Sequence, residues 1–183
     1  MYNASIIMLN SDTQKVITSE LRKKSEDVSL LAELLVKTGC TAHPLSKKRV
    51  REMRTFIEQN IQFLPTELIS RLENHMESLD DEDYFFTGQR SDNHNNPLSK
   101  RSYESLLLNT GNTLGIRNLS VKALTRSFYY GYLRDHNYDF DKLKGHMRTR
   151  GRYVYDLDYF LVYCGISENE YEMDRLKHFN RAF

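Results

Sequence analysis

Between residues 143 and 155 the chain gathers side chains whose types could act on a phosphate group. Gly145-His146 is followed nine residues later by Tyr155, and three arginines stand between them, at positions 148, 150 and 152. The planar guanidinium of arginine matches phosphate oxygens with paired donors, and a tyrosine hydroxyl can act as a nucleophile. The segment therefore predicts an anionic partner such as a phosphate, with His146, Tyr153 and Tyr155 close to the arginines in sequence.

Each of these residues also has a plainer interpretation. The chain has twelve tyrosines, and Tyr153 or Tyr155 could be a half-buried ring that packs its own helix. His146 could cap a helix that ends at Gly145 by donating to a carbonyl group. Arg148, Arg150 and Arg152 could be solvated, although three arginines within five residues beside a helix end favour an anionic partner.

Charge is distributed unevenly along a chain whose net charge is only +1. From Arg117 to Tyr155 there are nine Lys or Arg residues and three Asp residues, whereas from Glu67 to Asp83 there are seven acidic residues and one basic residue, Arg71. A basic segment beside acidic ones is typical of a one-sided DNA-binding face. Solvated helix faces would give the same counts.

Length and composition indicate one globular domain, residues 1–183, with a substantial core. No apolar run approaches the roughly 20 residues of a membrane span, and the first residues lack a signal-peptide pattern. Cys40 and Cys164 lie far apart in apolar surroundings, which predicts reduced core cysteines in a cytoplasmic protein.

Apolar spacing and capping residues predict that helices position these side chains. We expect helices over 12–24, 25–38, 66–79, 99–113, 122–136, 140–145, 155–164 and 167–179. A β-hairpin is predicted at Met53–Leu64, a short strand at Tyr84–Phe86, and a mobile polar loop at Gly88–Pro97. The expected fold class is therefore α+β, mainly helical with a small antiparallel sheet.

In this order, short motifs resemble the catalytic domain of the tyrosine recombinase (phage integrase) family. The resemblance covers nearly the whole chain: a buried helix ending in Thr38-Gly39, the stretch Leu124-Thr125-Arg126-Ser127-Phe128, and Gly145-His146 with Tyr155 downstream. It implies DNA strand exchange and integration on double-stranded DNA through a phosphotyrosine, with no metal and no other cofactor. His146 and Tyr155 are then the catalytic residues. The family's additional N-terminal DNA-clamping domain has no counterpart here.

The chain departs from the family pattern at the charged positions. Thr41 and Thr125 stand where the two arginines are expected, and Lys122 where a second histidine is expected. Arg126 is one residue from the second arginine position, and one helical step turns it by about 100°. Losing one preorganised donor typically costs a factor of about 10²–10³ in rate. The resemblance thus implies impaired catalysis.

Taken together, these patterns predict a DNA-binding regulator or accessory recombination factor of phage or mobile-element type. The DNA contacts would be Lys122, Arg126, Arg148, Arg150 and Arg152. Two alternatives remain: an active site-specific recombinase in which Arg126, Arg148 or Arg150 fills the vacant arginine positions, and a helical module that binds other proteins.

The C-terminal residues predict a separate helix with an intermolecular role. It follows Gly165, begins with the capping box Ser167-x-x-Glu170, and carries apolar residues at positions 166, 171, 176 and 179. Such an element could dock on a second copy of the chain and form a homo-oligomer, or it could fold back on its own core.

Overall fold

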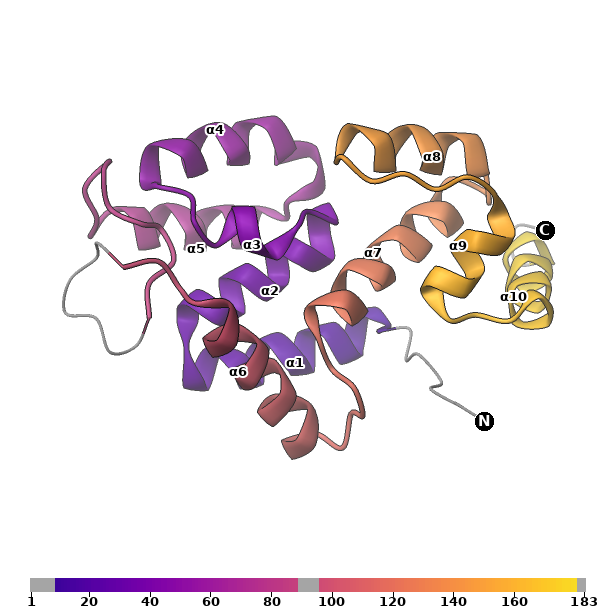
Figure 1. The fold of residues 1–183 in the computed structure, drawn as a ribbon, viewed down its shortest axis with the longest axis horizontal. Helices are drawn as coiled ribbons and strands as arrows, with labels where there is room; N and C mark the ends of the chain where they lie inside the picture. Colours follow the sequence, from indigo (N-terminus) through magenta and orange to yellow (C-terminus); the bar gives the residue numbers. More distant parts are fainter. Residues whose placement is uncertain (1–8, 89–95, 181–183) are drawn as a thin grey trace.

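A computed structural model describes residues 9–88 and 96–180 of the chain, and within these ranges the fold is all-helical (Figure 1). The helices are α1 (Ser11–Lys24), α2 (Glu26–Thr38), α3 (Ala42–Leu45), α4 (Val50–Asn60), a 3₁₀ turn η1 (Ile61–Phe63), α5 (Thr66–Met76), α6 (Lys100–Thr113), α7 (Val121–Asp135), α8 (Phe140–Thr149), α9 (Leu157–Cys164) and α10 (Glu168–Asn180). None of these helices is long and apolar enough to cross a membrane.

The predicted α+β class, with its small antiparallel sheet, is wrong. The residues of the predicted hairpin, Met53–Leu64, form most of α4 and the turn η1. Met53, Phe56, Ile57 and Asn60 are buried at positions i, i+3, i+4 and i+7, which is helical spacing. This periodicity prevails over the turn-like residues 58–60.

The predicted strand Tyr84–Phe86 is wrong too. Tyr84 makes one isolated bridge, with Arg49, and the next residue after the segment, Thr87, makes another with Pro97; these build no sheet. The backbone of the segment is irregular, and the rings of Phe85 and Phe86 are both fully buried in the core. Most of the predicted mobile loop, Gly88–Pro97, lies outside the described residues.

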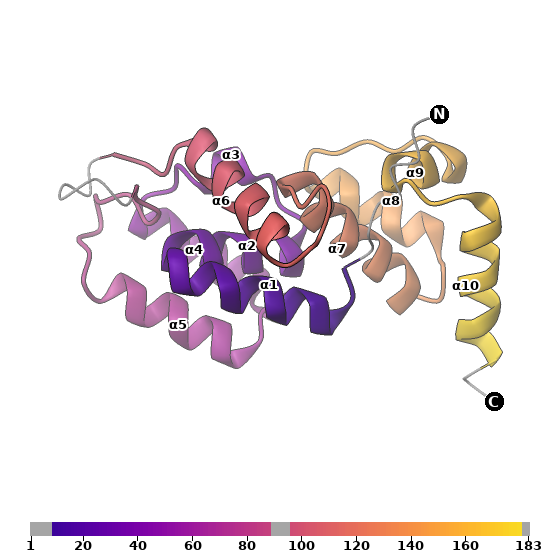
Figure 2. The ribbon, with the colours of Figure 1, turned by 90° about the horizontal axis from the view of Figure 1, so that it is seen from below.

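Two hydrophobic clusters organise the chain, and helix α7 contributes to both. The first contains Leu124 of α7 with buried residues of the preceding helices, and the second contains Tyr129, Tyr130 and Leu133 of α7 with residues that follow. In Figures 1 and 2, α1–α6 gather at one end of the molecule and α8–α10 at the other, with α7 between them. The seam between the clusters therefore runs along α7.

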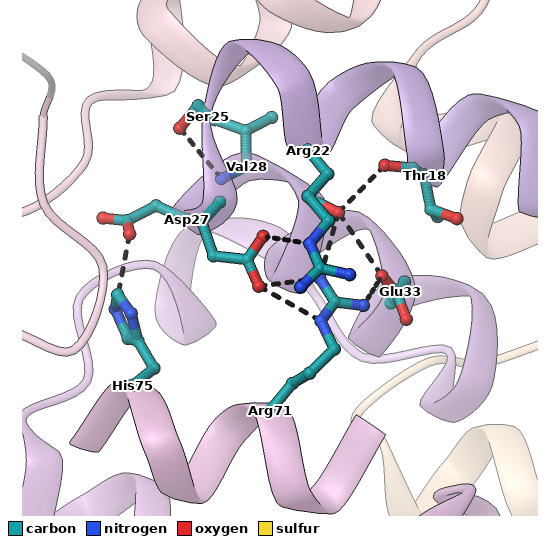
Figure 3. A network of polar contacts seen from close by, with 10 residues as sticks. Thr18, Arg22, Ser25, Asp27, Val28, Glu33, Arg71 and His75 are labelled. Carbon is teal, nitrogen blue, oxygen red and sulfur yellow. Dashed lines mark hydrogen bonds and ion pairs between the residues drawn. The ribbon is translucent and has the colours of Figure 1, made fainter. Parts of the chain in front are cut away.

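A network of ion pairs ties α5 to α2 within the first cluster (Figure 3). Arg71 of α5 pairs with Glu26 at 2.8 Å and also with Glu33, both on α2. Asp27 accepts a hydrogen bond from the Thr87 backbone N–H and lies 3.3 Å from His75 Nε2. Burial raises the pKa of Asp27. These contacts join the acidic segment Glu67–Asp83 to α2. The guanidinium group of Arg71 is paired with two carboxylates.

Helix α10 packs on its own chain. Tyr171 is buried against Tyr138 with ring centroids 5.5 Å apart, and Asp174 accepts hydrogen bonds from the hydroxyls of Tyr130 and Tyr138. The predicted capping box forms, with Ser167 N–H donating to Glu170 at 2.8 Å. The faces of α10 that carry Met173 and Leu176 stay exposed.

Candidate anion-binding site

Three arginines converge where the end of α8 meets α7. Arg126 comes from the middle of α7, Arg150 follows the last residue of α8, and Arg152 lies two residues further. Between the last two, Gly151 adopts φ +68°, and Arg152 N–H donates to Met147 O at 2.9 Å. This turn brings Arg150 and Arg152 back toward the body of the protein. We call Arg126, Arg150 and Arg152 the arginine cluster.

The cluster lies against the residues that follow α2. Arg150 Nη1 donates to Cys40 Sγ at 3.2 Å, and its Nη2 donates to the side-chain oxygen of Asn60. Arg152 Nη2 lies 3.5 Å from the hydroxyl oxygen of Thr41. The guanidinium groups therefore occupy the neighbourhood of the position where the resemblance places the family's first arginine.

Aromatic rings surround the cluster. Arg152 Nη1 donates to the Tyr163 hydroxyl at 3.0 Å, and the Arg126 guanidinium lies 4.9 Å from the centroid of the same ring. The Arg152 guanidinium also lies 5.5 Å from the Tyr129 centroid. Stacked rings attract a cation through their quadrupole, by about 0.5–1 kcal/mol at exposed sites. Ring faces thus stabilise a group of three like charges without neutralising them.

No carboxylate within the described residues pairs with the cluster. Arg126, Arg150 and Arg152 make no ion pair in that part of the chain, and the Nε atom of each is buried without a hydrogen-bond partner. Arg71, in contrast, is bound by two glutamates. Buried polar nitrogens without partners are rare in proteins and each requires a physical reason. Three half-buried guanidinium groups without a carboxylate partner in the described chain are suited to an anion with several oxygens, such as a phosphate.

His146 lies beside the cluster in an aromatic box. Its ring stacks on Tyr132 with centroids 4.3 Å apart, and lies 5.4 Å from both Phe63 and Phe128. Burial, together with the nearby charge of Arg150, lowers the pKa of His146 to about 4, so the imidazole is neutral near pH 7. Its Nε2 atom is buried and has no hydrogen-bond partner. The side chain therefore offers one neutral nitrogen next to the anion site.

The lowered pKa of His146 predicts a pH-dependent stability. The folded pKa of about 4 is below the ordinary histidine value of 6.5, so the unfolded chain binds the proton more tightly. His146 thus contributes stability that is fully present above about pH 6.5 and is lost as the pH falls toward 4. Urea unfolding of the protein should lose more stability over this window than urea unfolding of His146→Gln.

A matched control for that measurement is His43→Gln, which removes an exposed imidazole on α3. It should keep the pH dependence of the unmodified protein. Identical pH profiles for His146→Gln and the unmodified protein would show that the imidazole is not held neutral by the fold.

The other predicted site residues lie apart from the cluster. Tyr155 is 81% exposed, and its ring contacts Tyr159, with centroids 6.3 Å apart. Lys122 in the first turn of α7 and Arg148 in the last turn of α8 are both exposed. The structure therefore brings His146 together with Arg126, Arg150 and Arg152, and places the candidate nucleophile outside that group.

The turn of α7 explains why Arg126 joins the cluster. Thr125 is buried, and its hydroxyl oxygen lies 3.2 Å from each of the carbonyl oxygens of Val121 and Lys122. Arg126, one residue further, lies on the half-buried face toward Tyr163. Sequence reasoning missed Asn60 and Tyr163, because nothing in their local sequence distinguishes them from core residues.

The geometry defines a cationic, partly buried site that is suited to a polyoxygen anion. No protein-family model matches the chain, and no curated protein and no solved structure matches it either. The site must therefore be interpreted from its own chemistry.

Proposed function

We propose that this protein binds DNA through the phosphate backbone at the arginine cluster and does not cleave it. The observation that carries the proposal is the convergence of Arg126, Arg150 and Arg152, whose buried Nε atoms have no partner and whose charges meet no carboxylate within the described residues. Phosphodiester oxygens supply the negative charge that the cluster lacks and accept hydrogen bonds from guanidinium groups.

The charge pattern of the chain supports a polymeric anion. The cluster belongs to the segment from Arg117 to Tyr155, in which nine basic residues accompany three acidic ones. Lys122 and Arg148 are exposed in the same segment and could contact neighbouring phosphates. The order of motifs that resembles the tyrosine recombinases supports duplex DNA as the ligand, with a role as a regulator or accessory recombination factor of phage or mobile-element type.

The position of Tyr155 favours binding without catalysis over the alternative of an active recombinase. An attacking tyrosine needs cationic donors already directed at the phosphate that it attacks. Tyr155 is 81% exposed and makes its ring contact with Tyr159, and no hydrogen bond or cation–π contact joins it to an arginine of the described chain. Its hydroxyl therefore lacks the neighbours that would activate it.

A salt titration tests the proposal. The affinity for a fluorescein-labelled DNA duplex is measured by anisotropy at several salt concentrations. The logarithm of the affinity should fall linearly with the logarithm of the salt concentration, because each neutralised phosphate releases counterions. With about three to five phosphate contacts the slope should be roughly −3 to −4.5. Absence of duplex binding at 50 mM salt would remove the proposal.

The same preparation, mixed with nicked duplex substrates, separates binding from cleavage. Denaturing electrophoresis should show no covalent protein–DNA adduct. An adduct that disappears in Tyr155→Phe would establish the active recombinase instead. Homo-oligomerisation through the apolar residues Ile166, Tyr171, Leu176 and Phe179 remains a prediction, to be measured as the mass in solution. Of these, Tyr171 is buried within its own chain, while Leu176 and Phe179 are exposed.

A further inference from the structure

Three exposed tyrosines follow Arg152 of the arginine cluster along the chain. Tyr153, Tyr155 and Tyr159 are 70%, 81% and 54% exposed, although tyrosine is a residue that proteins usually bury at least in part. They come from the connection between α8 and α9 and from the first turn of α9. The group consists of aromatic rings with a polar end, and differs in this from the aliphatic faces that commonly pair two helices.

The connection presents its two kinds of side chain on opposite sides. Arg152 and Val154 are half-buried, while Tyr153 and Tyr155 are exposed, so residues alternate between the protein and the solvent. Arg152 turns inward to Tyr163 and Thr41. The outer side of the segment that follows the cluster therefore carries exposed tyrosine rings, of which Tyr155 and Tyr159 meet edge to face.

From this placement we infer that the protein binds unpaired nucleotides, with the backbone of a single strand at the arginine cluster and its bases stacked on Tyr153, Tyr155 and Tyr159. The inference rests on the proposed function and specifies its ligand further. Base–aromatic stacking requires an open ring face and tolerates every base, because each base has a π-face. In a duplex the bases are already stacked on each other and cannot use these rings.

Charge near the tyrosines supports this occupant over a protein helix. The cluster lacks carboxylate partners within the described residues. A nucleic-acid strand carries one negative charge per nucleotide, so successive phosphates could pair with successive arginines. Two acidic side chains lie at the start of α9. Asp156 is engaged as the helix cap, accepting from Tyr159 N–H at 2.7 Å, and Asp158 is exposed on the first turn. Because these two carboxylates repel phosphate groups, the phosphates of the strand would lie on the arginine side and its bases on the tyrosine side.

The test compares a 20-nucleotide single strand, of DNA and of RNA, with a duplex of the same sequence and with an abasic strand. Replacing Tyr153 and Tyr155 by Ala should weaken binding of the normal single strands by about tenfold or more. Binding of the duplex and of the abasic strand should change by less than about threefold. The corresponding Phe variant should retain the affinity of the parent, because it keeps the ring faces.

Leu108→Ala serves as a matched control, since it removes an exposed apolar side chain, 52% exposed, from α6. It should change no affinity. Unchanged single-strand affinity in the Tyr-to-Ala variant overturns the inference and leaves duplex binding intact. A Phe variant as weak as the Ala variant also overturns it, and so does a change of mass in solution without a change of affinity. Failure of the parent to bind the duplex at 50 mM salt would instead remove the proposed function.

Discussion

Replacing Arg126, Arg150 and Arg152 together by Gln is expected to reduce DNA affinity by about a thousandfold or more and to lower the melting temperature. Hydrogen bonds that involve a charged group contribute about 1.5–3 kcal/mol each, so three lost phosphate contacts exceed about 4 kcal/mol. The slope of log affinity against log salt should also become less steep by roughly 2.7, at about 0.9 per phosphate.

The stability falls in this variant because Arg150 no longer donates to Cys40 and Asn60, and Arg152 no longer donates to Tyr163. A lost hydrogen bond costs about 0.5–1.5 kcal/mol, and each kcal/mol corresponds to roughly 2–4 °C for a chain of this size. Anisotropy and differential scanning calorimetry measure the two effects.

The matched control removes the same charge elsewhere, through Arg51→Gln, Arg54→Gln and Arg175→Gln. Each of these arginines is paired with a carboxylate, on Glu82, Asp81 and Glu172 respectively. The control should lose little DNA affinity, because its charges lie on other elements and long-range interactions are screened within about 8–10 Å. A control as weak as the cluster variant would show that total charge decides binding and that the cluster is not the site.

Gly39→Ala is expected to destabilise the fold by about 2–5 kcal/mol. Gly39 ends α2 at φ +64°, a left-handed conformation that costs an alanine about 1–2 kcal/mol. An added Cβ would also meet two ring atoms of Phe128, at 2.4 and 2.7 Å. Adding a carbon atom to a well-packed core typically costs about 1–3 kcal/mol. We expect a cost of this size for displacing the Phe128 ring. Urea unfolding measures the sum.

Gly115→Ala separates the two contributions to that change. Gly115 has φ +68° and nothing within 4 Å of an added Cβ, so it should show the backbone cost alone, about 1–2 kcal/mol. Phe128→Leu, combined with Gly39→Ala, should recover part of the difference if the ring is the obstacle. Equal losses in the two glycine variants would mean that Phe128 moves aside at no cost.

Much of the helical framework follows from local signals. Ser25 caps α2 by accepting from Val28 N–H, and Gly39 ends it, as the sequence predicts. The hairpin prediction failed because Ile61-Gln62-Phe63-Leu64 alternates like a strand, while the burial of Met53, Phe56 and Ile57 favours a helix. Local patterns of this kind conflict when a helix ends in a 3₁₀ turn, and packing in the folded chain decides between them.

The candidate site was only half accessible to sequence reasoning. The density of arginines between residues 148 and 152 marks the segment, and Gly145-His146 marks its helix. The partners of Arg150, however, are Cys40 and Asn60, which lie 110 and 90 residues away along the chain. Such contacts depend on how the end of α4 packs beside the end of α8 in the folded chain. No periodicity or motif in the sequence predicts them. The exposure of Tyr155 is likewise a property of the folded chain.

The position of the arginine cluster at the seam between the two hydrophobic clusters has a consequence for cooperativity. Cys40 packs against the first cluster, whereas Tyr163 packs against the second, and guanidinium groups contact both. Local opening in proteins proceeds by units that coincide with such packing groups. A bound phosphate would stabilise the state in which both units are closed on each other. A ligand at the site would thereby couple the unfolding of two units that α7 already joins. Unfolding of the chain would then be more cooperative with the ligand bound than without it.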